Sequence, residues 1–305
     1  MKNTKFYIAL IIIMSGGLAY AQFPSAHSMY MFDQLMINPA YAGGHGQFSA
    51  MAIHQNQLQK FPGAPKNTIV TAHSSLAQNK MGLGLLFTHQ VTGAHTDQSL
   101  FMSYSYKFKM PTGELSMGVQ AGVQSLKTET WLVAPVNPNI SSFITGIEPN
   151  FGTGLHYTNK DFFVGFSVPY LLNRGVISGS TGVLSDAKRR RSFYLTAGNA
   201  WNISPKFKFV PAALIQVQED LPLNFDLNTH IVYKDALGLG AGYRLKEGLV
   251  LMSELKLNEE VYVGYAYNVA ATDIQKYSGG VHEIMLNYRY RIPQWHKGME
   301  RPSFF

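Results

Sequence analysis

The residues of this chain most suited to chemistry are histidines that lie close to serines or carboxylates. A base and a nucleophile within hydrogen-bond reach could support hydrolysis. The candidates are His73-Ser74-Ser75, His89, His156 and His282-Glu283. They fall on separate strand-like segments, and His282 and Glu283 point to opposite faces because they are neighbours in a strand. Nothing in this spacing assembles a catalytic group, so we expect a protein that is not an enzyme.

Motifs for metals, cofactors and nucleic acids are missing from the sequence. The chain has no cysteine, and it contains no paired histidines at helical spacing and no calcium loop. The glycine-rich run Gly238–Gly242 lies within a strand-like segment, whereas a nucleotide-binding loop precedes a helix. Basic residues do not alternate with aromatic ones in a patch. We therefore expect no cofactor, no metal ion and no nucleic-acid partner.

Strands must position these side chains, because apolar and polar residues alternate from about Phe48 to Ile292. Successive side chains of a strand point to opposite faces. In the last segment one face carries Ile284, Leu286, Tyr288, Tyr290 and Ile292, and the other carries Glu283, Asn287, Arg289 and Arg291, with Met285 as the exception. One apolar face and one charged face are typical of a transmembrane β-barrel. The predicted fold is all-β, an antiparallel barrel of about 14 strands over residues 47–292.

The connections between the expected strands alternate in length. Short ones include Ala77 to Lys80 and Met110 to Gly113, and the longest are Lys127 to Glu148 and Tyr170 to Arg190. Outer-membrane barrels have short periplasmic turns and longer outside loops. This alternation and an even number of strands predict that both termini are periplasmic.

The first 21 residues have the features of an export signal. Lys2 and Lys5 precede an apolar run from Phe6 to Leu18, and Ala19-Tyr20-Ala21 matches a cleavage site. We therefore expect residues 1–21 to be removed and the protein to lie in the outer membrane. Removal of Lys2 and Lys5 lowers the formal net charge from +7 to +5 (7 − 2 = 5), and this mild positive excess favours contact with acidic lipid headgroups.

Polar residues of the later strands would face the lumen of this barrel. Their mixed charges predict internal ion pairs and hydrogen bonds. Glycines on the same faces, such as Gly238, Gly240 and Gly242, leave space for something packed against the wall, which indicates a filled interior. The expected lumen network consists of Asn224, Asp226, Asn228, Arg244, Glu254, Lys256, Glu260, Glu283, Arg289 and Arg291.

Residues 22–46 do not alternate as a strand would. An apolar cluster with Tyr30, Met31, Phe32 and Leu35 is followed by the turn-rich run Asn38-Pro39-Ala40-Tyr41-Ala42-Gly43. Such a cluster needs burial, so we expect a plug or rim segment that also contacts partners. The alternative is a leader strand that extends the sheet. Residues 293–305 form a separate tail.

The run Tyr30–Gly43 resembles the opening signature of the PorP/SprF family of the Bacteroidota type IX secretion system. Later stretches agree with the family in order along the chain. These stretches are Gln55-Asn56-Gln57 with Pro62–Pro65, Asn224–Asn228, and Gly264–Asn268 followed by Gly279–Ile284.

The resemblance implies a non-enzymatic role in secretion and gliding. The implied partner is a secreted adhesin or other type IX substrate, bound through its C-terminal domain. Periplasmic ring components or peptidoglycan-linked components are further partners that it implies. Two alternatives remain, a passive porin and a small-solute transporter of the fatty-acid type.

Overall fold

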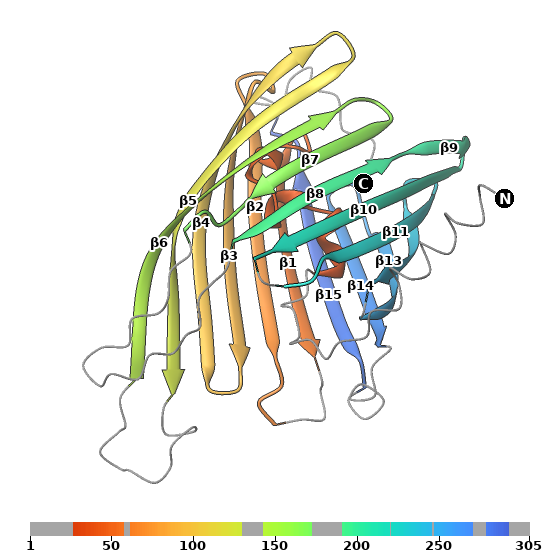
Figure 1. Ribbon diagram of the computed structural model, residues 1–305. Coiled ribbons are helices and arrows are strands. Elements are labelled where there is room, and N and C mark those ends of the chain that lie inside the picture. The colour runs from red at the N-terminus through yellow and green to blue at the C-terminus, as the bar shows by residue number, and fades with distance from the viewer. Residues whose placement is uncertain are drawn as a thin grey trace, which may run out of the picture.

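The structure, a computed structural model, is a closed antiparallel β-barrel (Figure 1). It describes residues 27–57, 62–129, 143–172, 191–219, 221–245, 247–270 and 279–292. The expected export signal and C-terminal tail lie outside these residues. No helix within them is long and apolar enough to cross a membrane.

Strands that follow one another along the chain pair with each other, except that β8 pairs with β10 and not with β9, and β1 pairs with β15 to close the ring. β8 and β9 both pair with β10 and are separated only at Ala200, so together they occupy one position and the ring has the expected 14. The strands are β1 (Phe48–Gln57), β2 (Lys66–Leu76), β3 (Met81–Thr92), β4 (His95–Met110), β5 (Gly113–Glu129), β6 (Phe143–Thr158), β7 (Phe162–Val168), β8 (Ser192–Asn199), β9 (Trp201–Ser204), β10 (Phe207–Gln218), β11 (Asn224–Tyr233), β12 (Leu237–Arg244), β13 (Gly248–Lys256), β14 (Val261–Ala270) and β15 (Val281–Tyr290).

The alternation in the sequence corresponds to the two faces of the barrel wall. In β15, Ile284 and Leu286 are 61% and 53% exposed, whereas Glu283 and Asn287 are buried. Met285 interrupts the polar face because it is buried among apolar residues of the lumen. The outer face is therefore apolar and suited to lipid, and the inner face is mainly polar.

Tight turns join the strands at one end of the barrel. Lys234 and Asp235, between β11 and β12, both have a φ of 51°. Two central residues with positive φ make the type I′ turn that matches the twist of a hairpin. We call this end the short-turn end and the opposite one the long-loop end.

The wall is uneven at the long-loop end. β4, β5 and β6 have 16, 17 and 16 residues, whereas β7 has only 7. β5 and β6 stay paired as far as Glu129 and Phe143, so the connection expected from Lys127 to Glu148 is partly strand. In Figure 1, β5 and β6 continue below the level at which β7 and β8 end.

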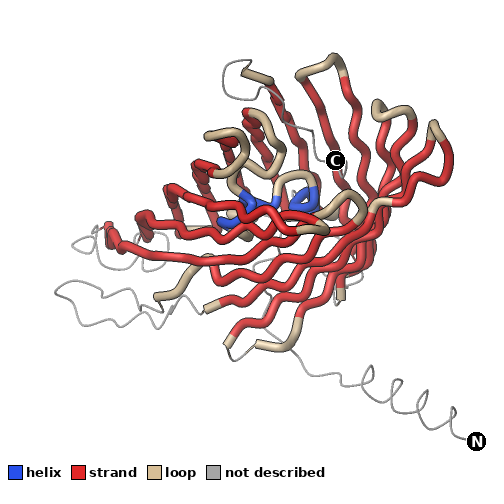
Figure 2. Tube along the Cα trace, turned by 90° about the horizontal axis from the view of Figure 1, so that it is seen from above, coloured by secondary structure: helices blue, strands red, loops and turns tan. Residues whose placement is uncertain are grey.

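Three short 3₁₀ helices lie inside the ring of strands (Figure 2). They are η1 (Ser28–Met31), η2 (Gln34–Met36) and η3 (Pro39–Tyr41). Every residue from His27 to Gly43 is buried. We call this stretch the lumen segment, and its path through the barrel sets the geometry of the candidate site.

Candidate functional site

Local capping explains the shape of the lumen segment. The Asp33 side chain accepts a hydrogen bond from the Leu35 N–H at 2.9 Å, and the Asn38 side chain accepts one from the Ala40 N–H at 2.9 Å. Both residues are N-caps of the helix that follows. Pro39 begins η3, where the missing N–H costs nothing. The run after Asn38 is therefore a capped turn of helix.

The lumen segment runs along the barrel axis. β2 begins at the long-loop end, and the segment contacts it in sequence order, through His27 with Asn67, Asp33 with Thr71, and Gly43 with His73. His27 is thus close to the long-loop end and Gly43 to the short-turn end. The expectation that both termini are periplasmic concerns residues outside the described ones.

The first turn of the segment is tied to the pair of strands that closes the barrel. Glu283 of β15 and Gln55 of β1 stand opposite each other. Glu283 Oε1 accepts hydrogen bonds from the Gln55 side chain at 2.9 Å and from the Ser28 N–H at 3.0 Å. One buried carboxylate therefore joins both strands to the segment.

Wall side chains also bind the main chain of the segment. Ser105 donates to the Ala42 carbonyl at 2.8 Å, Lys107 Nζ to the Gly43 carbonyl at 2.8 Å, and Ser167 to the Ile37 carbonyl at 2.6 Å. In the other direction, Asn38 Nδ2 donates to the Leu155 carbonyl of β6 at 3.0 Å. Buried carbonyls need such partners, so these polar wall residues are matched to the segment.

Glycines of the wall allow the segment to approach closely. A Cβ at Gly118 would overlap Ala40, one at Gly154 would overlap the Asn38 side chain, and one at Gly82 would overlap the Ala42 carbonyl. Sequence reasoning did not select these glycines. The sequence feature that could have identified them is an inward-facing position in a strand. Other glycines of the wall share this feature.

Asp33 and His73 form a buried polar contact between segment and wall. His73 Nδ1 accepts from the Gly43 N–H at 3.2 Å, so the ring proton lies on Nε2, which is 3.5 Å from Asp33 Oδ1. The Thr71 hydroxyl also donates a hydrogen bond to the Asp33 carboxylate. Sequence reasoning missed this contact.

The apolar side chains of the segment join the core of the barrel. Met29, Met31 and Phe32 are fully buried in one cluster with Met285 and Met252. Phe32 meets the His230 ring edge-on at 5.1 Å between centroids. The Tyr30 hydroxyl accepts a hydrogen bond from Asn228 Nδ2 at 2.9 Å. Of the residues expected in the plug or rim, Tyr30, Met31, Phe32, Leu35, Asn38, Pro39, Ala40, Tyr41, Ala42 and Gly43 are all buried.

Part of the expected lumen network gathers on β11 and β12. Arg244 Nε donates to Asp226 Oδ1 at 2.9 Å, and its NH1 donates to Glu247 Oε2 at 3.0 Å. Glu247 was not among the expected residues. The buried members of the expected network are Asn224, Asp226, Asn228, Arg244, Glu254, Glu283 and Arg289.

The remaining expected members lie away from the lumen interior. Lys256 donates to Glu259 at 3.0 Å beside a short turn, and Glu260 is half-buried in that turn. Arg291 is exposed, because β15 ends at Tyr290 and the alternation of faces ends with it.

The histidines considered for chemistry do not come together. His73 and His156 face the lumen, where both contact the Tyr41 ring, while His282 lies on the outer half of the wall beside the Tyr265 hydroxyl at 2.6 Å. Among the described residues, no group of three or more His, Asp or Glu could hold a metal ion.

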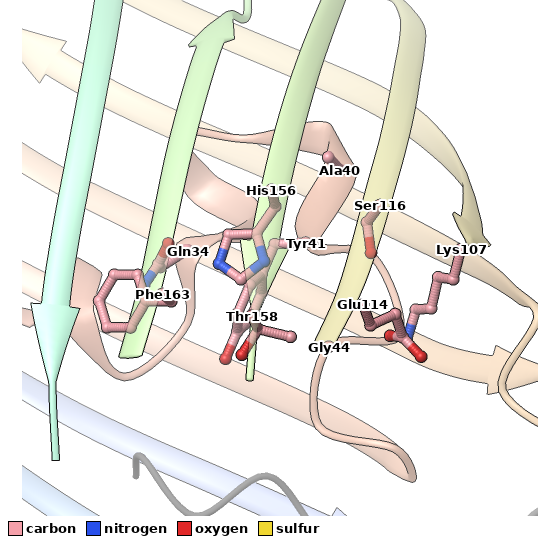
Figure 3. A pocket seen from close by; sticks show the side chains of 10 residues that line it. All are labelled: Gln34, Ala40, Tyr41, Gly44, Lys107, Glu114, Ser116, His156, Thr158 and Phe163. Atoms are coloured by element: carbon pink, nitrogen blue, oxygen red, sulfur yellow. The ribbon is translucent and has the colours of Figure 1, made fainter. Parts of the chain in front are cut away.

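A small pocket lies between η3 and the wall near the short-turn end. Its volume is about 30 Å³, which is room for little more than a water molecule. Figure 3 shows its lining, Gln34, Ala40, Tyr41, Gly44, Lys107, Glu114, Ser116, His156, Thr158 and Phe163.

Comparisons with known proteins bear on the family and the fold. The family described as type IX secretion system membrane protein PorP/SprF matches residues 19–288. Searched against the curated proteins, the chain finds no match. Among solved structures, the toluene transporter TbuX of Ralstonia pickettii is 11% identical with a TM-score of 0.52, over 87% of this chain and 94% of that one. Omp33 of Acinetobacter baumannii is 9% identical with a TM-score of 0.42, over 81% and 98%. The TbuX match shows a shared outer-membrane barrel fold.

Proposed function

This chain belongs to the PorP/SprF family of type IX secretion system membrane proteins, and we propose that it is a non-enzymatic outer-membrane component that binds a secreted surface protein. In this proposal the chain binds the C-terminal domain of the partner, and this binding helps to export or anchor the partner. The lumen segment serves as a plug that closes the barrel. Residues 1–21 direct export and are then removed.

The observation that carries this proposal is the filled lumen. The segment from His27 to Gly43 is buried throughout, and hydrogen bonds tie it to β2, β4, β6, β7, β11 and β15. A passive porin instead has a water-filled lumen with a charged constriction. A filled barrel favours a scaffold for partners over a channel.

A transporter of small apolar solutes is the second candidate, because TbuX is named as a toluene transporter. Pockets for such ligands are mostly apolar and occupy roughly 300–1,000 Å³. The pocket beside η3 has about 30 Å³ and is lined by Lys107, Glu114 and His156 among others. A larger hollow of about 410 Å³ at Leu251, Tyr265 and Tyr267 is open to the surroundings, so the size and polarity of the pocket inside the barrel favour the secretion role.

Affinity purification from native outer membrane tests the proposal. We expect a secreted surface protein to co-elute with the tagged full-length chain and to lose that association when its C-terminal domain is removed. Secretion-ring or peptidoglycan-linked components would be further partners on the periplasmic side. Recovery of only unrelated abundant proteins would contradict the proposal.

A further inference from the structure

Near the long-loop end, the described residues leave one edge of β6 without a partner strand. β6 pairs with β5 along its full length, to Phe143 opposite Glu129, whereas its pairing with β7 begins only at Thr153 opposite Val168. On the β7 side, residues 143–152 therefore have no partner strand among the described residues. At about 3.3 Å per residue, this step in the wall is roughly 30 Å along the strand.

The direction of the backbone groups can be worked out along β6. In an antiparallel sheet, alternate residues direct both N–H and C=O to the same neighbour. The Phe151 carbonyl accepts from the Leu171 N–H at 2.8 Å on the β7 side. Residues of the same parity, Thr145, Ile147 and Pro149, consequently point their backbone groups away from β5.

The presence of Pro149 is consistent with an exposed sheet edge at this position. Proline has no N–H to donate and is confined in sheets to edges, first residues and bulges. Because its nitrogen points away from β5, the ladder between β5 and β6 loses no hydrogen bond. Thr145 and Ile147 then offer the backbone donors and acceptors of the exposed edge.

The free part of the edge stands above the membrane. A transmembrane strand needs about 9–11 residues, and counting 11 back from Thr158 reaches Glu148. An unpaired edge at membrane depth would be very costly. Within that depth, the Leu171 N–H donates a hydrogen bond to the Phe151 carbonyl and so covers this part of the edge. Ile147 lies beyond that depth and is 70% exposed.

We propose that the edge of β6 at Thr145 and Ile147 binds an extended strand of the secreted partner, which would add to the barrel wall by β-augmentation. An open edge gives affinity through main-chain hydrogen bonds, and its place at the long-loop end fits a partner held outside the cell. This inference rests on the proposed function and specifies its binding surface.

Proline at position 147 tests the edge selectively. Ile147→Pro removes an outward N–H while the inward hydrogen bonds to β5 remain, and the preceding Gly146 accommodates the proline ring. Ile147→Val is the matched control because it keeps the N–H. The probe is the recombinant C-terminal domain of the secreted protein that co-purifies with the wild-type chain.

We expect Ile147→Pro to weaken binding of this domain at least tenfold and Ile147→Val to change it less than threefold. Both variants should keep the migration of a folded barrel on unheated gels. Equal affinity of the proline variant and wild type would overturn the edge inference while leaving the proposed function standing. Failure of any secreted protein to co-purify with wild type would instead defeat the proposed function.

Hydrogen exchange separates an open edge from one covered by the chain itself. We expect the Thr145 and Ile147 amides to exchange rapidly in the purified protein and to become protected when the C-terminal domain is added. Slow exchange without the domain would mean that another segment of this chain already pairs with the edge, and would overturn the inference.

A photo-crosslinking residue at position 147 provides a test in intact cells. Leu155 is the control position, on the same outer face of β6 but at membrane depth. We expect an adduct with the secreted protein from position 147 and none from position 155. The same adduct from both positions would contradict binding at the edge.

Discussion

Inward-facing glycines on two sides of the barrel make room for different neighbours. Gly82, Gly118 and Gly154, on β3, β5 and β6, face the main chain or the Asn38 side chain of the lumen segment. Gly240 and Gly242, on β12, face the side chains of His230 and Asn228, which belong to the neighbouring strand β11. The same residue type thus admits a plug on one side and the wall's own side chains on the other.

This difference shows on which side of the barrel the packing of the wall depends on the lumen segment. A side chain such as His230 can turn about its bonds, whereas the main chain of a capped helix cannot move without breaking its hydrogen bonds. We therefore expect the β3–β6 side to respond strongly to changes in the lumen segment and the β11–β12 side to respond weakly.

Removal of the lumen segment should have the largest effect. Deleting Met29 to Gly43 removes Met29, Met31, Phe32 and Leu35, and loss of a buried side chain of this kind costs about 2–5 kcal/mol. We expect the deletion to abolish partner binding or barrel stability, as measured by co-purification and by the urea midpoint of unfolding. A stable deleted barrel that still recovers its partner would contradict the docking role.

Adding one methyl group on each side compares the two glycine sets directly. Gly118→Ala would force the methyl against the Ala40 backbone, at a cost of about 3 kcal/mol, whereas Gly240→Ala should cost about 1 kcal/mol because the His230 ring can shift. The free energy of unfolding in urea measures both. Equal losses would remove the distinction between the two sides.

Loss of the Asp33 carboxylate should leave its hydrogen-bond donors without an acceptor. The side chain accepts from the Leu35 N–H at 2.9 Å and from the Thr71 hydroxyl, and leaving a buried donor unpaired costs about 1–3 kcal/mol.

Asp33→Ala should therefore lower the free energy of unfolding by about 2 kcal/mol. The free energy of unfolding in urea provides the test, with Asp161→Ala as a control at an exposed position. An unchanged free energy of unfolding in the Asp33 variant would show that these hydrogen bonds contribute nothing.

The contact between Tyr30 and Asn228 should have the smallest effect. Tyr30→Phe removes one buried hydrogen bond and keeps the ring, so we expect a loss of about 1 kcal/mol. A double-mutant cycle with Asn228→Ala should show coupling between the two residues. Strictly additive losses would mean that the bond contributes nothing.

The architecture of the wall was largely predictable from local pattern. Alternation in segments such as Glu283–Tyr290 identified the strands and their faces, and chain order with antiparallel pairing led to the 14-position ring. The extension of β5 and β6 toward residues 129 and 143 was missed. A long loop and a pair of strands that continue beyond the membrane occupy the same place in the sequence, and the pattern of the residues does not distinguish them.

The contacts within the lumen were less predictable. The burial of Phe32 and Leu35 was expected from their apolar character. Which glycines face Ala40 and Asn38, namely Gly118 and Gly154, depends on which strands meet the segment after the ring closes. The pairing of Asp33 with His73 depends on the same closure. Arg291 was expected to face the lumen because the alternation of faces was assumed to continue past Tyr290, where β15 ends.

Single-channel conductance of the purified full-length protein in planar bilayers tests the central claim most directly. A barrel closed by its lumen segment should show no steady conductance, and Gly118→Ala, which displaces the segment at Ala40, should produce openings. Steady, open-channel conductance of the wild-type protein would contradict the account and favour a passive porin.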